Sequence, residues 1–158
     1  MFRELQRKKQ KLSDDEAVEI LKNQVRGVLA VLGDREYPYA MPVNYWYNES
    51  NGKIYFHTGK FGHRTDSLKK HNKVSFCVYD EGFRREGEWA LNIKSVIVFG
   101  KISMLEDEET IKHVMEPFSR KFTQDDEYIK KEIESFTKNT LLLELSIENM
   151  CGKIVNES

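Results

Sequence analysis

The basic side chains of one glycine-broken segment, residues 57–64 (HTGKFGHR), are the first candidates for chemistry. Lys60, His63 and Arg64 stand where we expect a short helix, over residues 62–71, to begin. Positive side chains are unfavourable at the N-terminal end of a helix, where the helix dipole is itself positive. A bound phosphate would reverse this cost, because it accepts hydrogen bonds from the free backbone N–H groups and from the basic side chains. The segment is therefore a candidate phosphate site, and a solvated basic turn is the alternative.

A second candidate is the segment PYAMPVNYWY, residues 38–47, which places aromatic and apolar residues beside Asn44. If this segment pairs with KIYFHT, residues 53–58, Asn44 and His57 face the same side of a sheet. An amide that both donates and accepts hydrogen bonds, on an apolar floor, suits a planar heteroaromatic ring with a phosphate tail. The alternative for the aromatic residues is ordinary packing in a β-sheet core. The chain has neither a Walker loop nor a G-x-G-x-x-G motif, so the ligand need not be a nucleoside triphosphate or a dinucleotide.

His57 is the residue that we expect to transfer a proton or to tune the reaction, because imidazole changes charge near neutral pH. The alternative is that His57 only forms a hydrogen bond with a cofactor or with the core.

These residues need a scaffold, and local patterns predict most of it. Ser13 and Glu16 form an S-x-x-E capping box that predicts a helix over residues 14–23. Spaced apolar residues predict two more helices between Asp107 and Lys138, separated at residues 123–126. The two prolines of residues 38–47 indicate a strand at a sheet edge or one interrupted by a bulge. Residues 80–93 are expected to form a long loop that leads into a strand, and residues 149–158 to trail off. The predicted strands are residues 26–32, 38–47, 53–58, 73–79, 95–105 and 140–147.

Short connections and the hairpin signal Asn51-Gly52 favour antiparallel pairing of these strands. Six or seven such strands indicate a small barrel with helices packed outside it. With 158 residues and no linker-like segment, we expect a single domain over residues 1–158.

The overall charge argues against some function classes. The 25 basic and 26 acidic residues give a net charge of −1, so a general attraction to nucleic acid or membrane surfaces is not indicated. No apolar run has the length of a membrane span, and the N-terminus lacks the apolar core of a secretory signal. Cys77 and Cys151 have no metal-ligand spacing and suit free thiols in a reducing compartment. We therefore expect a cytoplasmic protein without a metal site, a nucleic-acid partner or a membrane partner.

Three sequence blocks carry a resemblance to a known family: residues 35–47, 53–78 and 95–109. Together they resemble the signature blocks of the pyridoxamine 5′-phosphate oxidase-like flavoproteins, and within these the branch of nitroimidazole-resistance proteins. The resemblance implies a mainly β fold, a six- to seven-stranded antiparallel split β-barrel (Greek key) with flanking α-helices. It also implies a homodimer with FMN bound at the dimer interface.

The resemblance assigns roles by position. The residues that would line the isoalloxazine ring are Met41, Pro42, Val43 and Asn44. The residues beside the ring and the ribityl chain would be Phe56, His57 and Thr58. The phosphate would be held by Lys60, His63 and Arg64. From the partner subunit, Ser95 and Val96 would approach the flavin, with Trp89 and Asn92 as weaker candidates. Glu36 departs from a Gly that is common in the family. The C-terminal segment has no Arg, so activity on pyridoxamine phosphate is not expected.

The leading hypothesis is thus an FMN-dependent oxidoreductase, similar to nitroreductases. The alternatives are a non-catalytic flavin-binding protein for storage, sensing or electron relay, and a split barrel that binds haem. An aromatic platform for nucleic acid is disfavoured by the balanced charge. The apolar run Val96–Phe99 supports a homodimer, because such a run would be unfavourable at a free sheet edge.

Overall fold

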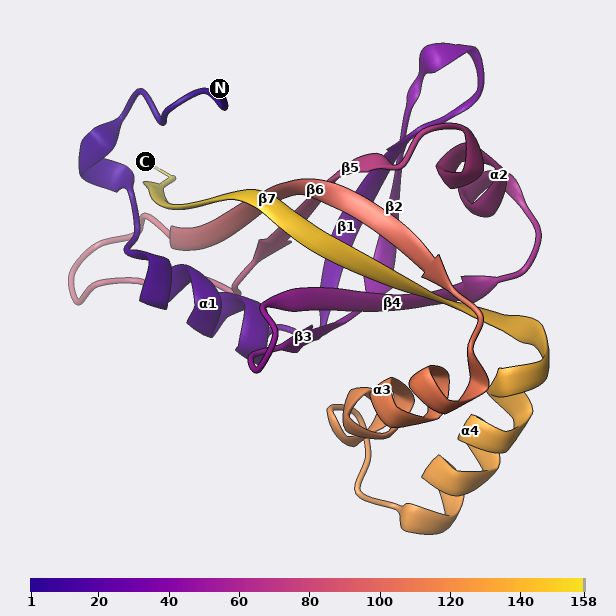
Figure 1. Ribbon diagram of the computed structural model, residues 1–158. Coiled ribbons are helices and arrows are strands. Elements are labelled where there is room, and N and C mark those ends of the chain that lie inside the picture. Colours follow the sequence, from indigo (N-terminus) through magenta and orange to yellow (C-terminus); the bar gives the residue numbers. More distant parts are fainter. Residues whose placement is uncertain (158) are drawn as a thin grey trace.

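The computed structural model describes residues 1–157, and the side chains of residues 137–139 are not among those described. Over this part of the chain, seven strands form one antiparallel sheet that curls into a half-barrel, with four α-helices around it (Figure 1). The strands are β1 (Arg26–Leu32), β2 (Pro38–Asn44), β3 (Trp46–Asn48), β4 (Lys53–Gly59), β5 (Lys73–Tyr79), β6 (Asn92–Leu105) and β7 (Thr140–Asn156). The helices are α1 (Asp14–Asn23), α2 (His63–Lys70), α3 (Glu108–Arg120) and α4 (Asp126–Asn139), with short 3-10 turns η1 (Lys8–Gln10) and η2 (Asp34–Glu36). The expected mainly β split barrel is confirmed.

The sheet has the order β2-β1-β5-β6-β7-β4-β3, so β2 and β3 are its edges. Both prolines of the predicted strand 38–47 lie in β2, where the missing N–H groups break no ladder, as we expected. That strand is interrupted at Tyr45, whose buried hydroxyl donates a hydrogen bond to the Leu21 carbonyl oxygen at 2.8 Å. The Tyr45 side chain thereby fixes the end of α1 against the corner between β2 and β3.

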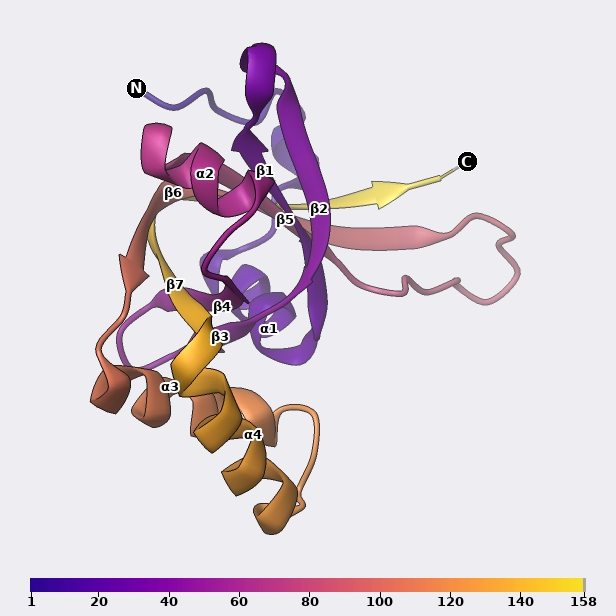
Figure 2. The same cartoon turned by 90° about the vertical axis from the view of Figure 1, so that its right-hand side faces the viewer.

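Strands β6 and β7 form a long two-stranded ribbon that crosses the molecule (Figure 1). The expectation that residues 149–158 trail off was wrong, because β7 continues to Asn156 and pairs with the first half of β6. The partners there include Val96 with Gly152 and Ile93 with Val155. Beyond the barrel, the outer ends of both strands and the loop that follows β5 project as an arm (Figure 2). The predicted long loop into a strand is confirmed, although the strand begins at Asn92.

The run Val96–Phe99 lies in the interior of the sheet, between β5 and β7, and not at a free edge. Val96 and Val98 are buried in the core, whereas Phe99 on the opposite face is 41% exposed. This run is therefore not the unpaired edge from which a homodimer was expected. What remains is an exposed apolar sheet face, and the homodimer stays a prediction.

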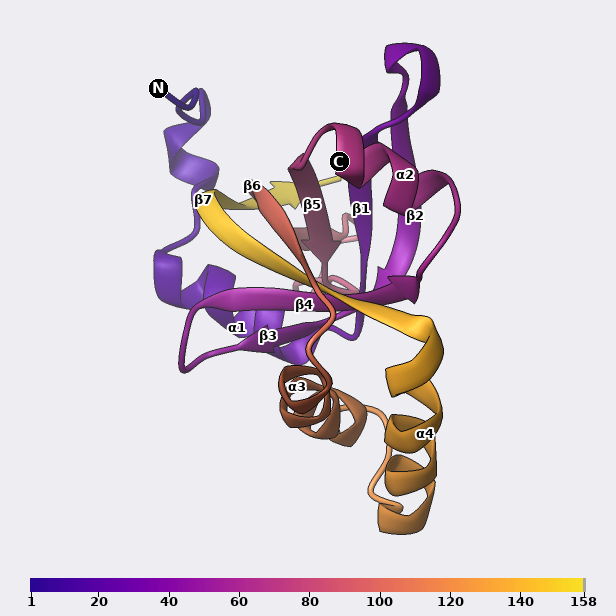
Figure 3. The same cartoon turned by 45° about the vertical axis from the view of Figure 1, so that its right-hand side comes forward.

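The core fills the inside of the curled sheet, where Leu29, Phe56, Phe76 and Val98 are fully buried. Helix α1 closes one side, and its capping box forms as predicted: the Ser13 hydroxyl accepts from the Glu16 amide at 3.2 Å. Helices α3 and α4 lie below the barrel as a separate hairpin (Figure 3). They pack in a second apolar cluster with Tyr55 of β4 and Leu142 of β7. Among the described residues, no helix is both long and apolar enough to cross a membrane.

Candidate functional site

The N-terminus of α2 is open toward solvent. Gly62 is the N-cap residue, with a φ of 118° that favours glycine, and no side chain caps this end of the helix. A Cβ atom built at Gly62 would meet no other atom within 4 Å. The glycine-broken turn therefore leaves room for a ligand to approach the first N–H groups of the helix.

Arg64, in the first turn of α2, carries its guanidinium into the protein. Its Nε donates to the Met41 sulfur at 2.9 Å, and one Nη contacts the His57 carbonyl oxygen at 3.5 Å. None of the carboxylates in the described part of the chain pairs with it. Burial lowers the pKa of Arg64, which reflects the cost of holding this cation away from water. A half-buried cation without a counter-ion is a site that favours an anionic ligand.

The other two basic residues of the segment differ from each other. Lys60 is half-buried and forms no hydrogen bond or ion pair within the described residues. His63 instead turns toward the loop between β1 and β2, where its ring stacks on Tyr39 at 4.2 Å. Its Nε2 accepts a hydrogen bond from the Asp34 amide at 3.2 Å. Within the described residues, the structure thus leaves Lys60 and Arg64 without a carboxylate partner and engages His63 with Tyr39 and the Asp34 amide.

Asn44 and His57 line one cavity of about 260 Å³ between the sheet and the α3–α4 hairpin. The pairing from which we expected them to share a side was wrong for Asn44, because β2 pairs with β1 and only β3 pairs with β4. The Asn44 amide oxygen accepts a hydrogen bond from Arg26 Nε at 3.1 Å, so its NH₂ group remains to donate to a ligand. The other lining residues are Met115, Phe118, Ser119, Phe122, Thr123, Tyr128, Glu132 and Phe136.

The imidazole of His57 contacts two aromatic rings and is influenced by one positive and one negative side chain. Its centroid is 5.5 Å from that of Phe118 and 4.9 Å from that of Phe136. Burial lowers the pKa of His57, the positive charge of Arg64 lowers it further, and the carboxylate of Glu132 raises it. The net direction is downward, so the ring is neutral at pH 7 and can donate one hydrogen bond and accept another.

Other predicted site residues lie in the core or further away. The side chains of Met41, Val43, Phe56 and Val96 are buried in the main core, so mainly their backbone is available to a ligand. Pro42 is exposed and Thr58 is half-buried. Ser95 lies in the first half of β6, far along the sheet from His57, whose strand pairs with the first residues of β7.

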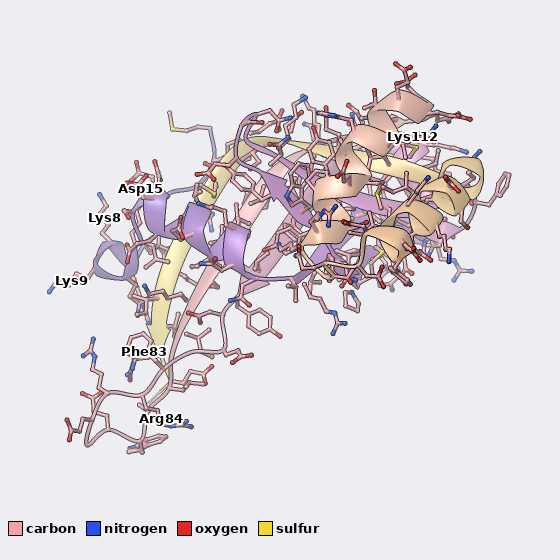
Figure 4. The ribbon with its side chains drawn as sticks, turned by 90° about the horizontal axis from the view of Figure 1, so that it is seen from below. Lys8, Lys9, Asp15, Phe83, Arg84 and Lys112 are labelled. Atoms are coloured by element: carbon pink, nitrogen blue, oxygen red, sulfur yellow. The ribbon has the colours of Figure 1, made fainter. Side chains whose placement is uncertain are left out.

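Trp89 and Asn92 line a different hollow, of about 600 Å³, which is formed mainly by residues of the arm. Figure 4 shows Phe83 and Arg84 on this arm, at the end of the molecule away from Lys112 of α3. Within the described chain, Trp89 and Asn92 therefore do not line the cavity at His57.

Glu132 and the aromatic residues around it were missed as site residues. In the sequence, Phe118, Phe122, Tyr128 and Phe136 belong to the apolar stripes that predict two amphipathic helices. The overlooked signal is spacing: Tyr128, Glu132 and Phe136 are four residues apart, so a carboxylate shares the aromatic face of α4. In the described residues, no cluster of three or more His, Cys, Asp or Glu side chains could hold a metal ion.

The family model described as pyridoxamine 5′-phosphate oxidase matches residues 13–154 of this chain. The chain belongs to the pyridoxamine 5′-phosphate oxidase family. The match includes all seven strands and all four α-helices of the described structure, except the last residues of β7. No curated protein matches the sequence.

Solved structures with this family fold include a candidate 5-nitroimidazole antibiotic resistance protein of Bacteroides thetaiotaomicron. Its TM-score is 0.77 at 18% identity, over 92% of this chain and 87% of that one. A FAD-binding protein of Mesorhizobium loti has a TM-score of 0.66 at 22% identity, over 92% and 96% of the two chains. A FAD and haem binding protein of Mycobacterium smegmatis has a TM-score of 0.71 at 17% identity, over 96% and 75%. At these identities the likeness establishes the fold.

Proposed function

We propose that the chain is an FMN-dependent oxidoreductase of the nitroreductase type, active as a homodimer with the flavin at the subunit interface. The observation that carries the proposal is the half-buried guanidinium of Arg64, which has no carboxylate partner among the described residues and lies beside an uncapped helix N-terminus. The family supports a flavin as the ligand, and two of the structural neighbours are named as FAD-binding proteins.

The residues present fit FMN better at its phosphate than at its ring. Lys60, Arg64 and the first N–H groups of α2 would hold the phosphate, since the two side chains are positive without a carboxylate partner in the described residues and no side chain caps the helix. Asn44 and His57 would contact the polar edge of the ring from the cavity floor. A bound flavin supplies the electron and hydride transfer, and the protein supplies position and electrostatics. The neutral His57 can hold a proton at one ring nitrogen and accept one at the other.

Pyridoxamine 5′-phosphate is not our proposed substrate, despite the family name. The last half of β7, where the family pattern implies an Arg-containing block for the substrate phosphate, has no Arg in this chain. A nitroaromatic acceptor fits the resemblance to the nitroimidazole-resistance branch and the structural neighbour of that description.

The test is the absorption spectrum of the purified protein, followed by extraction and chromatography of any chromophore. We expect flavin bands and released FMN, and turnover of a nitroimidazole with NADH or NADPH as the electron donor. A colourless protein that does not bind added FMN would refute the proposal. Bound FMN without turnover would favour the non-catalytic alternative. A Soret band would favour the haem alternative, which is also suggested by the neighbour named for FAD and haem.

A further inference from the structure

The cavity above His57 is walled mainly by aromatic side chains from the helical hairpin. Phe118 and Phe122 of the α3 segment stack on each other at 5.8 Å, and Tyr128 and Phe136 come from α4. The faces of aromatic rings carry partial negative charge, and they attract cations within about 6 Å of the ring centre. Phe118 is buried and Phe136 half-buried, whereas Phe122 and Tyr128 are 43% and 55% exposed, so the four rings line a pocket that is partly open to solvent. A pocket lined by aromatic rings is a favourable environment for a positive group.

Glu132 adds a full negative charge to this pocket. It is half-buried, lines the cavity, and forms no ion pair or hydrogen bond with any residue that the structure describes. Its carboxylate acts electrostatically on His57, which burial and Arg64 keep in the neutral form. No Lys or Arg is among the residues that line the cavity. The carboxylate of Glu132 is thus uncompensated in the part of the chain described.

A small ligand suits this pocket, whose volume of about 260 Å³ is below the roughly 300 Å³ at which sites for drug-sized ligands begin. A single ring or a compact alkyl group with one positive end fits inside it, and the exposed rings of Phe122 and Tyr128 leave it partly open to solvent. An anion would meet both the carboxylate and the ring faces, and a neutral ligand would leave the carboxylate without a partner.

We propose that this cavity binds a small organic ammonium ion, carried on a short aromatic or apolar body, and that Glu132 selects for its positive charge. Phe118, Phe122, Tyr128 and Phe136 provide the contact surface, and the ammonium group lies toward Glu132. That this site lies beside a flavin rests on the proposed function, because Asn44 and His57 belong to both sites. The ligand chemistry itself follows from the cavity alone.

The experiment measures binding of three probes of similar size to the protein as purified, by isothermal titration calorimetry at neutral pH. The probes are benzylammonium, benzyl alcohol and benzoate. We expect benzylammonium to bind about tenfold more tightly than benzyl alcohol, and benzoate not to bind. Glu132→Gln should make the affinities for benzylammonium and benzyl alcohol nearly equal. Glu134→Gln, on the same helix but lining a different hollow with Lys112 and Lys130, is the matched control and should keep the preference.

Equal affinity of the wild-type protein for all three probes, or an unchanged preference in Glu132→Gln, would overturn the proposal. The three titrations of the wild-type protein test the proposal by themselves, so it stays falsifiable even where a variant folds poorly. The titrations are repeated with FMN at saturation, which separates this proposal from the proposed function. Failure to bind FMN, with cation preference intact, refutes the flavoprotein proposal and supports the cation site. Bound FMN without cation preference refutes the cation site and leaves the flavoprotein proposal standing.

Discussion

At the scale of single residues, the unusual feature is a guanidinium that faces sulfur and a carbonyl oxygen instead of a carboxylate. Arg64 contacts Met41 and His57 only through weak or long hydrogen bonds, at 2.9 Å to sulfur and 3.5 Å to oxygen. Contacts of this kind do not compensate for removing a cation from water. A ligand phosphate beside Lys60 and Arg64 would compensate for it, with charge-assisted hydrogen bonds.

Arg64→Ala should therefore weaken FMN binding by about tenfold or more, since hydrogen bonds to charged groups contribute about 1.5–3 kcal/mol. Riboflavin, which lacks the phosphate, should lose much less affinity. Without flavin, the variant should be as stable as the wild type or slightly more stable, because a cation leaves the positive end of the α2 dipole. Flavin titrations and thermal melting measure these effects, with Lys69→Ala in the exposed last turn of α2 as the control. Equal losses for both flavins would show that Arg64 does not bind the phosphate.

At the scale of elements, one lysine connects the helical hairpin to the barrel. Lys121, the C-cap residue of α3, donates from Nζ to the Tyr45 carbonyl oxygen at 3.3 Å and lies 4.1 Å above the Tyr45 ring. Burial lowers the pKa of Lys121 from 10.5 to about 8. The folded protein therefore binds fewer protons than the unfolded chain between these two values, so the free energy of unfolding rises with pH in that window.

This linkage predicts a pH-dependent difference between the wild type and Lys121→Met. From about pH 8 to about pH 9.5, the stability of the wild type should rise relative to that of the variant. The rise should stay below about 1.4 kcal/mol per pH unit, because Lys121 is only partly buried and solvent reduces the effect. Urea denaturation at several pH values measures it. Parallel stability curves for the two proteins would mean that Lys121 is solvated like an ordinary surface lysine.

The long β6–β7 ribbon depends on a glycine at its irregular point. The register shifts between Phe99 and Gly100, where a Cβ atom would collide with the Ser146 carbonyl oxygen and lie 2.8 Å from Leu145 Cδ1. Gly100→Ala should therefore destabilise the protein by about 1–3 kcal/mol, through overpacking against backbone. In Gly59→Ala the new methyl group meets only the Phe61 carbonyl oxygen, at 3.7 Å, so the stability should change little. Chemical denaturation of the two variants checks this, and comparable losses would contradict the close approach at Gly100.

These elements also indicate what the sequence could predict. The capping box of Ser13 and Glu16 is a local signal, and α1 begins and ends where it was expected. The second half of β7 was missed because residues such as Asn149 and Gly152 have low β propensity, and their strand is imposed by pairing with the distant β6. His63 was assigned to the phosphate by its position, but its stacking on Tyr39 is a tertiary contact that spacing does not reveal. Packing between distant segments likewise placed Glu132 over His57.

At the scale of the whole molecule, the outer face of the sheet favours assembly. Val28 and Cys77 are cross-strand partners, as are Cys77 and Ile97, and their side chains share the face opposite the core. Phe99 continues this face and is 41% exposed, although the ring of Phe2 stacks on it at 5.7 Å. An apolar face across three strands, β1, β5 and β6, suits the centre of an interface between two copies.

We therefore expect a homodimer in sedimentation at micromolar concentration, and we expect Phe99→Glu to convert it to a monomer. A charge at the centre of an apolar interface would be buried without a partner, at a cost that a dimer of ordinary size does not tolerate. Lys112→Glu, on α3 and away from this face, makes the chain more acidic and should leave the dimer intact. If the flavin lies between subunits, monomeric Phe99→Glu should also bind FMN much more weakly, although Arg64 and Lys60 are unchanged. A monomer that binds FMN with wild-type affinity would place the whole flavin site within one chain. Dissociation of the dimer would then have no effect on cofactor binding.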